Sequence, residues 1–160
     1  MGLRHDDRVS VLRLVTDIAA PAQVCFDLSR SIDLHLESMA ASGERAVGGI
    51  TSGLIEAGQE VTWEARHFGI LWQVTSRITE YDPPRWFVDE MDEGRPFSTF
   101  RHEHTFEDVA GRTRMTDVVA FRTRWGLPVD LVVHAYLRHL LTVRNRAIRA
   151  QAESASPPGP

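Results

Sequence analysis

The feature that most constrains the fold is a long amphipathic stretch near the end of the chain, residues 128–153. Its apolar residues recur every three or four positions, which is the period of one helix face. They are Val132, Val133, Tyr136, Leu137, Leu140, Leu141, Val143, Ala147 and Ile148. Pro128 suits the first turn of a helix, where its missing N–H costs nothing. The apolar stripe continues for roughly five turns, so the helix needs a large apolar surface to lie on.

That surface is predicted to be a sheet. Residues alternate between apolar and polar in segments 10–18, 60–68, 70–80, 97–107 and 112–125, and less regularly in a shorter segment, 86–91. Such alternation is typical of antiparallel strands covered on one side. Pro21 predicts the start of a short helix, and residues 33–39 predict a second one. The glycines in residues 48–58 indicate strand ends and a mobile loop.

Composition narrows the possible functions. The chain has 160 residues and a net charge of −4, which fits one domain and gives no reason to expect nucleic-acid binding. All 18 basic residues are arginine, so a lysine Schiff base and a Walker A lysine are excluded. Cys25 is the single cysteine, so an internal disulfide and a cysteine metal cluster are excluded too.

The two ends of the chain are expected to contribute little to the fold. Residues 1–8 are polar and expected to be flexible, and residues 153–160, which end in Pro-Pro-Gly-Pro, are expected to be disordered. The domain should therefore span residues 9–152. No apolar run approaches the roughly 20 residues of a membrane span, and no secretory signal is visible. We therefore expect no membrane insertion and a cytoplasmic location.

Several segments carry a resemblance to a known superfamily. They are residues 18–28 (Ile-Ala-Ala-Pro-Ala-Gln-Val-Cys-Phe-Asp-Leu), residues 78–87 (Ile-Thr-Glu-Tyr-Asp-Pro-Pro-Arg-Trp-Phe), residues 89–91, and the alternating Phe100, His102, His104 and Phe106. With the order strand, two short helices, five or six strands and a long helix, they resemble the START-like (SRPBCC) superfamily. The resemblance covers about residues 9–152 and points to its polyketide cyclase/dehydrase-like, bacterial ligand-binding branch.

The resemblance implies an α+β helix-grip fold, in which a curved antiparallel sheet wraps around the C-terminal helix. It also implies a cavity between the two that binds a small, mostly apolar molecule, similar to a lipid, quinone or polyketide. Two alternatives stay open: a cyclase- or dehydratase-type enzyme, and an interaction module whose cavity is filled by side chains. No cofactor is expected, and nothing in the sequence fixes the oligomeric state.

Two histidines are the strongest candidates for chemistry. His102 and His104 are two residues apart on one strand, so both side chains leave the same face, beside Phe100 and Phe106. Such a pair could hold zinc if a carboxylate such as Glu90 or Asp117 were the third ligand. Because that third ligand is not assigned, we expect that no metal is required.

Asp117 is the acid most readily placed beside the histidines, because its neighbours Met115, Val119 and Phe121 are apolar. A symmetric hairpin about residues 108–112 would turn Asp117 away from them, whereas a slip of one residue would bring it onto their face. The apolar neighbours favour the slipped register. Asp117 should then be ionised beside a histidine of raised pKa, either for proton transfer to a ligand or as a structural pair.

The predicted ligand-binding residues combine this cluster with large apolar side chains. They are Trp63, His67, Trp72, Glu90, Phe100, His102, His104, Asp117, Phe121, Tyr136 and Leu140. His102, His104 and Asp117 are also the catalytic candidates. Asp89 and Glu90 point to opposite faces, so only one of them can reach the cavity, and the sequence leaves open which one.

Overall fold

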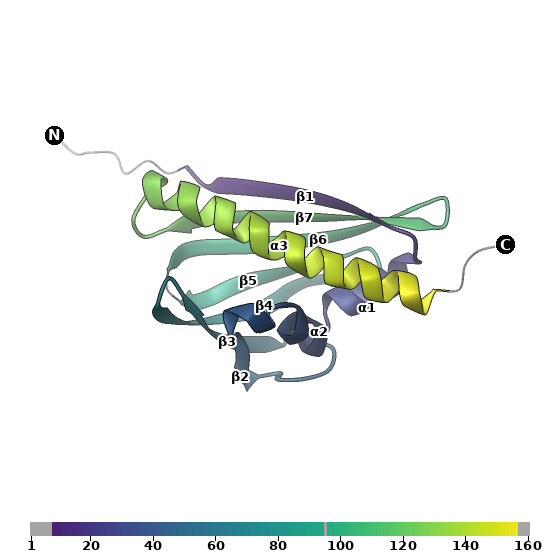
Figure 1. The fold of residues 1–160 in the computed structure, drawn as a ribbon, viewed down its shortest axis with the longest axis horizontal. Helices are drawn as coiled ribbons and strands as arrows, with labels where there is room; N and C mark the ends of the chain where they lie inside the picture. Colours follow the sequence, from purple (N-terminus) through teal and green to yellow (C-terminus); the bar gives the residue numbers. More distant parts are fainter. Residues whose placement is uncertain (1–7, 95, 157–160) are drawn as a thin grey trace.

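The computed structural model describes residues 8–94 and 96–156, and its elements follow the predicted order (Figure 1). The helices are α1 (Ala22–Ser29), α2 (Ile32–Ser38), the single turn η1 (Ala40–Ser42) and α3 (Leu127–Ala155). The strands are β1 (Ser10–Ile18), β2 (Arg45–Gly49), β3 (Glu60–His67), β4 (Ile70–Asp82), β5 (Trp86–Gly94), β6 (Phe97–Val109) and β7 (Arg112–Thr123). They form one antiparallel sheet in the order β1-β7-β6-β5-β4-β3-β2. The predicted α+β helix-grip fold is confirmed.

Helix α3 lies diagonally across one face of the sheet (Figure 1). Its residues Val133 and Leu141 pack with Leu12 of β1 and with Val119 and Phe121 of β7, and all five side chains are buried. Burial of apolar area stabilises a fold by about 25 cal/mol per Å². This contact therefore fixes α3 over the β1–β7 side of the sheet, and leaves space between the helix and the strands farther from β1.

Helix α1 fills one end of that space. Its Phe26 is fully buried and makes edge-on contacts with Tyr81, Phe87 and Phe106, each with a ring-centroid distance of 5.5 Å. Ile148 of α3 belongs to the same cluster. The C-terminal half of α3 therefore rests on a packed core, and any pocket must lie toward its N-terminal half.

Strands β6 and β7 pair in the slipped register, so the prediction for this hairpin is confirmed. His104 lies opposite Asp117 rather than Thr116. The cause is the turn: only Ala110 and Gly111 separate the paired strands, and both have positive φ, 55° and 78°. Two central residues of positive φ define a type I′ hairpin, whose length shifts the register by one residue from the symmetric estimate.

Replacing Ala110 by asparagine is expected to stabilise the domain. The left-handed conformation costs an ordinary L-residue roughly 1–2 kcal/mol, and asparagine tolerates it better. We expect Ala110→Asn to raise the free energy of unfolding by about 0.5–1 kcal/mol, measured by urea unfolding. Ala110→Val is the opposing control, because a β-branched residue is disfavoured at positive φ and should lower stability. An asparagine variant no more stable than the wild type would contradict the turn assignment.

An additional strand and a longer final helix are two of the differences from the predicted elements. Residues 45–49 form the edge strand β2, which pairs with β3 although its last two residues are glycine. At Gly49 an added Cβ would lie 2.1 Å from the Glu60 carbonyl oxygen, so the close strand approach requires glycine. Helix α3 continues to Ala155, past the expected start of the tail at residue 153.

The expected flexible residues 1–7 and tail residues 157–160 lie outside the described residues. No helix in the described part of the chain combines the length and the hydropathy needed to cross a membrane.

Candidate functional site

A pocket of about 570 Å³ lies between α3, the α1–α2 connection and the concave face of strands β3 to β6. This volume is within the roughly 300–1,000 Å³ of small-molecule sites. Most of its wall is apolar. The predicted residues that the structure places on the wall are Trp63, His67, Trp72, Phe100, His102, His104, Tyr136 and Leu140.

The pocket has a closed end and an open end. At the closed end His104 stacks on Phe87, with ring centroids 4.1 Å apart, and Phe87 packs on the α1 core. At the open end, lining residues Phe68, Trp125 and Val132 are 68%, 54% and 57% exposed. A molecule entering between these side chains would reach His104 only at the far end of the pocket.

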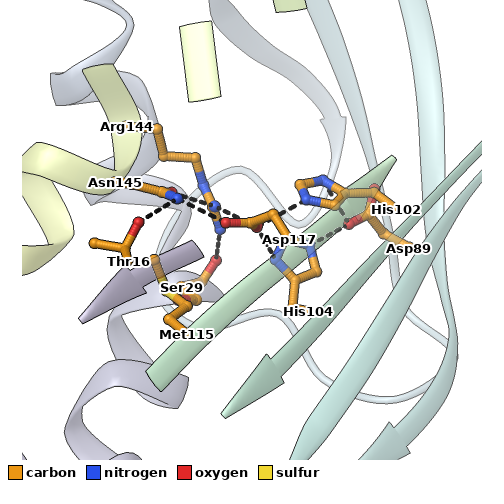
Figure 2. Close-up of polar contacts among 9 residues, drawn as sticks. All are labelled: Thr16, Ser29, Asp89, His102, His104, Met115, Asp117, Arg144 and Asn145. Carbon is orange, nitrogen blue, oxygen red and sulfur yellow. Dashed lines mark hydrogen bonds and ion pairs between the residues drawn. The ribbon is translucent and has the colours of Figure 1, made fainter. Parts of the chain in front are cut away.

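Those polar groups come from three neighbouring strands: Asp89 from β5, His102 and His104 from β6, and Asp117 from β7 (Figure 2). Asp89 is paired with His102 across the sheet, and His104 with Asp117. The hydrogen bonds run diagonally instead: His102 Nε2 lies 2.9 Å from Asp117 Oδ1, and His104 Nε2 lies 2.8 Å from Asp89 Oδ2. The two imidazoles lie against each other, with centroids 3.7 Å apart. Each histidine thus lies between two carboxylates.

Asp117 is the centre of this cluster and is fully buried. Besides His102, its carboxylate accepts a hydrogen bond of 2.6 Å from Asn145 Nδ2 and one of 3.4 Å from Arg144 Nη1. Arg144 also donates to the Ser29 carbonyl oxygen at 2.9 Å, so the network joins α3 to the end of α1 (Figure 2). A buried carboxylate requires such partners, since an unpaired buried charge is very costly.

The electrostatic environment favours the ionised form of both carboxylates and disfavours the protonated form of His102. Burial alone would raise the pKa of Asp117, but the hydrogen bond from His102, the adjacent His104 ring and the charge of Arg144 hold that pKa well below its usual range. The pKa of Asp89 is lowered for the same reasons, against burial. Burial and the neighbouring His104 lower the pKa of His102, despite its bond to Asp117. The predicted ionised Asp117 agrees with this picture, whereas the predicted raised pKa of its partner is wrong for His102.

Two further polar contacts lie nearer the open end. His67 Nδ1 is 2.7 Å from the Tyr136 hydroxyl, which ties β3 to α3 across the pocket. His35 of α2 lies 2.8 Å from Glu44 and against the Trp63 ring, with centroids 4.4 Å apart. These contacts hold the pocket wall in shape, and burial lowers the pKa of His67.

Three predicted ligand-binding residues are not on the pocket wall. Glu90 points to the opposite sheet face, where it pairs with Arg101 at 3.1 Å, because its neighbour Asp89 takes the inward position. Phe121 is fully buried where α3 packs directly on β7. Asp117 faces the same side as the histidines but lies behind them. Glu90 and Phe121 therefore do not line the pocket, and Asp117 is connected to it through its contacts with His102 and His104.

Sequence reasoning missed Arg144 and Asn145 and left Asp89 undecided. Arg144 and Asn145 are buried, and they follow Leu141 at spacings of three and four. Polar residues that continue an apolar stripe were the signal for them. For Asp89 the signal was weaker. Its neighbours on the same strand face, Phe87 and Met91, are apolar, but Val88 on the face of Glu90 is apolar too. Phe87 and Val88 are both buried, so burial does not distinguish the two faces either.

The cluster carries an unbalanced charge. Ionised Asp89 and Asp117 together with protonated Arg144 leave one net negative charge at the closed end of an apolar pocket. A proton on the histidine pair or a bound cation would balance it, since a net buried charge is unfavourable. The arrangement can therefore hydrogen-bond a ligand oxygen, exchange a proton with it, or hold a cation.

Known structures with this architecture are found among START and Bet v1-like helix-grip proteins. The aromatase/cyclase Zhui from Streptomyces sp. R1128 superposes with a TM-score of 0.72 at 15% identity, covering 91% of this chain and 94% of that one. A START superfamily protein from Mycobacterium smegmatis gives 0.69 at 9% identity, covering 91% and 99%. Major latex-like protein 151 from Panax ginseng gives 0.65 at 16%, covering 90% and 97%. These likenesses define the class of fold.

The sequence itself identifies the family. The profile of the family described as polyketide cyclase/dehydrase and lipid transport matches residues 11–153, nearly the whole described domain. The chain belongs to this family, and through it to the START-like superfamily. No curated protein sequence matches the chain significantly.

Proposed function

We propose that this protein binds a small, mostly apolar molecule with one oxygen-bearing end. The observation that carries the proposal is the pocket: most of its wall is apolar, and Asp89, His102 and His104 gather at its closed end. Family membership is consistent with ligand binding and with cyclase or dehydrase activity. The ligand class that fits is lipid-, quinone- or polyketide-like.

The apolar wall accounts for affinity. Burying about 300 Å² of apolar ligand surface contributes roughly 7 kcal/mol at about 25 cal/mol per Å², before the cost of association is subtracted. Micromolar binding therefore needs help from a polar contact. His102 supplies it at the closed end: its Nε2 faces Asp117, so its Nδ1 carries a lone pair that can accept a hydrogen bond from a ligand hydroxyl. Such a bond in a dry site discriminates strongly against a ligand that lacks the partner atom.

Native mass spectrometry of freshly purified protein tests the proposal directly. We expect a noncovalent adduct of a few hundred daltons that is lost on organic extraction. If the preparation is ligand-free and no apolar probe raises its thermal stability, the proposal fails, and the interaction module becomes the better reading. Turnover of the extracted molecule would instead support the enzyme alternative.

A matched pair of probes tests the polar end. Naphthol and naphthalene share one ring system and differ by a hydroxyl, and we expect naphthol to bind about 10-fold more tightly because it can hydrogen-bond the histidines. Isothermal titration calorimetry measures both affinities. His102→Phe should abolish the preference, whereas Glu90→Gln, on the other sheet face, should retain it. If the wild type bound both probes equally well, the histidines would not be the groups that bind the ligand's oxygen.

A further inference from the structure

Three side chains at the closed end of the pocket have the composition of a metal site. Asp89, His102 and His104 each offer one ligand atom, and these atoms all lie within 4.8 Å of one another. All three residues line the pocket. A zinc site needs a carboxylate beside the two histidines, and Glu90 and Asp117 were the predicted candidates for it. The structure supplies Asp89 in that position, because β5 turns it, rather than Glu90, toward the histidines.

The two separations that involve Asp89 are close to those between ligands of one bound ion. Bonds of about 2.1 Å to a zinc-like ion set two ligand atoms about 3.0 Å apart at a right angle and about 3.4 Å apart at the tetrahedral angle. Asp89 Oδ2 lies 2.8 Å from His104 Nε2 and 3.8 Å from His102 Nδ1. One separation must widen by a few tenths of an ångström and the other must shorten by a similar amount.

In each imidazole, the ring nitrogen that does not face Asp89 faces a second carboxylate, that of Asp117. His102 Nε2 lies 2.9 Å and His104 Nδ1 lies 3.1 Å from Asp117 Oδ1 (Figure 2). Histidine ligands of metals usually donate their other N–H to such a carboxylate, which fixes the tautomer and orients the ring. Asp117, itself held by Arg144 and Asn145, is placed to orient both rings at once.

His104 also shows a mismatch that a metal would remove. Its Nε2 bonds to Asp89, so a neutral ring carries its proton there, and a lone pair on Nδ1 then faces the Asp117 carboxylate. Among the buried side-chain nitrogens and oxygens of the described residues, Nδ1 of His104 is the one left without a well-aligned hydrogen-bond partner. A metal on Nε2 would move the proton to Nδ1, where it would point at Asp117 Oδ1.

We propose that Asp89, His102 and His104 bind a divalent transition-metal ion such as zinc or iron(II), with Asp117 orienting both histidines. Two histidines and one carboxylate leave coordination positions open, and these face the pocket. The ion also reverses the negative charge of the cluster, so an anionic ligand oxygen would complete it. Only this last step rests on the proposed function, because metal binding needs no organic ligand.

Cobalt(II) alone is the probe, added to full-length protein that has been stripped with a chelator. We expect binding at micromolar or lower Kd, with visible absorption from low-symmetry cobalt, and X-ray absorption of the wild type should show two imidazoles at about 2.0–2.1 Å. Asp89→Asn should weaken binding at least 100-fold. Glu90→Gln, at the neighbouring residue, and His139→Gln, at an exposed histidine of α3, are matched controls that should leave the Kd unchanged.

The wild-type spectrum keeps the test independent of how well the variants fold. No cobalt binding at about 1 mM, roughly the weakest Kd that would still be meaningful here, would overturn the proposal and leave the cluster as a proton-balanced network. So would binding that survives Asp89→Asn unchanged. Naphthol binding without cobalt binding would reject the metal site alone, and cobalt binding without any apolar ligand would reject the proposed function alone.

Discussion

Replacing Asp117 by asparagine is expected to lower the free energy of unfolding by about 3 kcal/mol, because it leaves the buried Arg144 charge without its counter-charge. The carboxylate holds His102, Arg144 and Asn145 together, and it is fully buried. A domain of this size has a total stability of about 5–15 kcal/mol, so the loss would be visible in thermal and urea unfolding. Since Asp117 does not line the pocket, its first effect is on stability rather than on ligand contact.

Two comparisons separate this effect from a general intolerance of mutation. Glu90→Gln removes a partly exposed carboxylate from Arg101, which also pairs with Glu80 at 2.9 Å, and should cost under about 0.5 kcal/mol. The double variant Asp117→Asn with Arg144→Met removes both charges. It should lose at least about 1 kcal/mol less than the sum of the single losses, since the charges are coupled. A loss below about 1 kcal/mol in Asp117→Asn would mean that the network is not ionised as described.

The fold was predictable because each element carries its own periodic signal. The stripe of α3 and the alternation of β3, β4, β6 and β7 each specify which face is buried, and an antiparallel sheet with one long helix leaves few ways to join those faces. The β6–β7 register shows the limit of this reasoning. Period-two alternation fixes the face of Asp117, but the choice between registers depended on whether Ala110 and Gly111 form the whole turn.

The site was only partly predictable, because its members come from five separate elements. His102 and His104 were found from spacing on one strand, and Asp117 from its apolar neighbours. Phe121 met the same criterion, yet it does not line the pocket, because the direct contact of α3 on β7 makes that part of the face core. Whether an inward residue becomes core or pocket wall depends on where the helix crosses the sheet, which no local pattern encodes.

Filling the pocket is expected to have the largest effect on binding. Val74 lies on the pocket wall and is not fully buried, so a tryptophan at this position would project into the existing space. Excluding about 120 Å² of apolar contact costs the ligand about 3 kcal/mol, or roughly 100-fold in affinity. We therefore expect Val74→Trp to weaken binding of the neutral fluorescent probe N-phenyl-1-naphthylamine by at least about 100-fold, measured by fluorescence titration.

The matched control is Gln73→Trp, which adds the same side chain to the adjacent, exposed position on the other face of β4. It should leave probe affinity within about twofold, a difference of roughly 0.4 kcal/mol. Val74→Trp itself should unfold at a temperature close to that of the wild type, because its ring enters empty space instead of a packed core. Should Val74→Trp bind the probe as tightly as Gln73→Trp does, the ligand does not occupy the space between α3 and the sheet. The exposed apolar side chains of Phe68, Trp125 and Val132 would then be the better place to look for it.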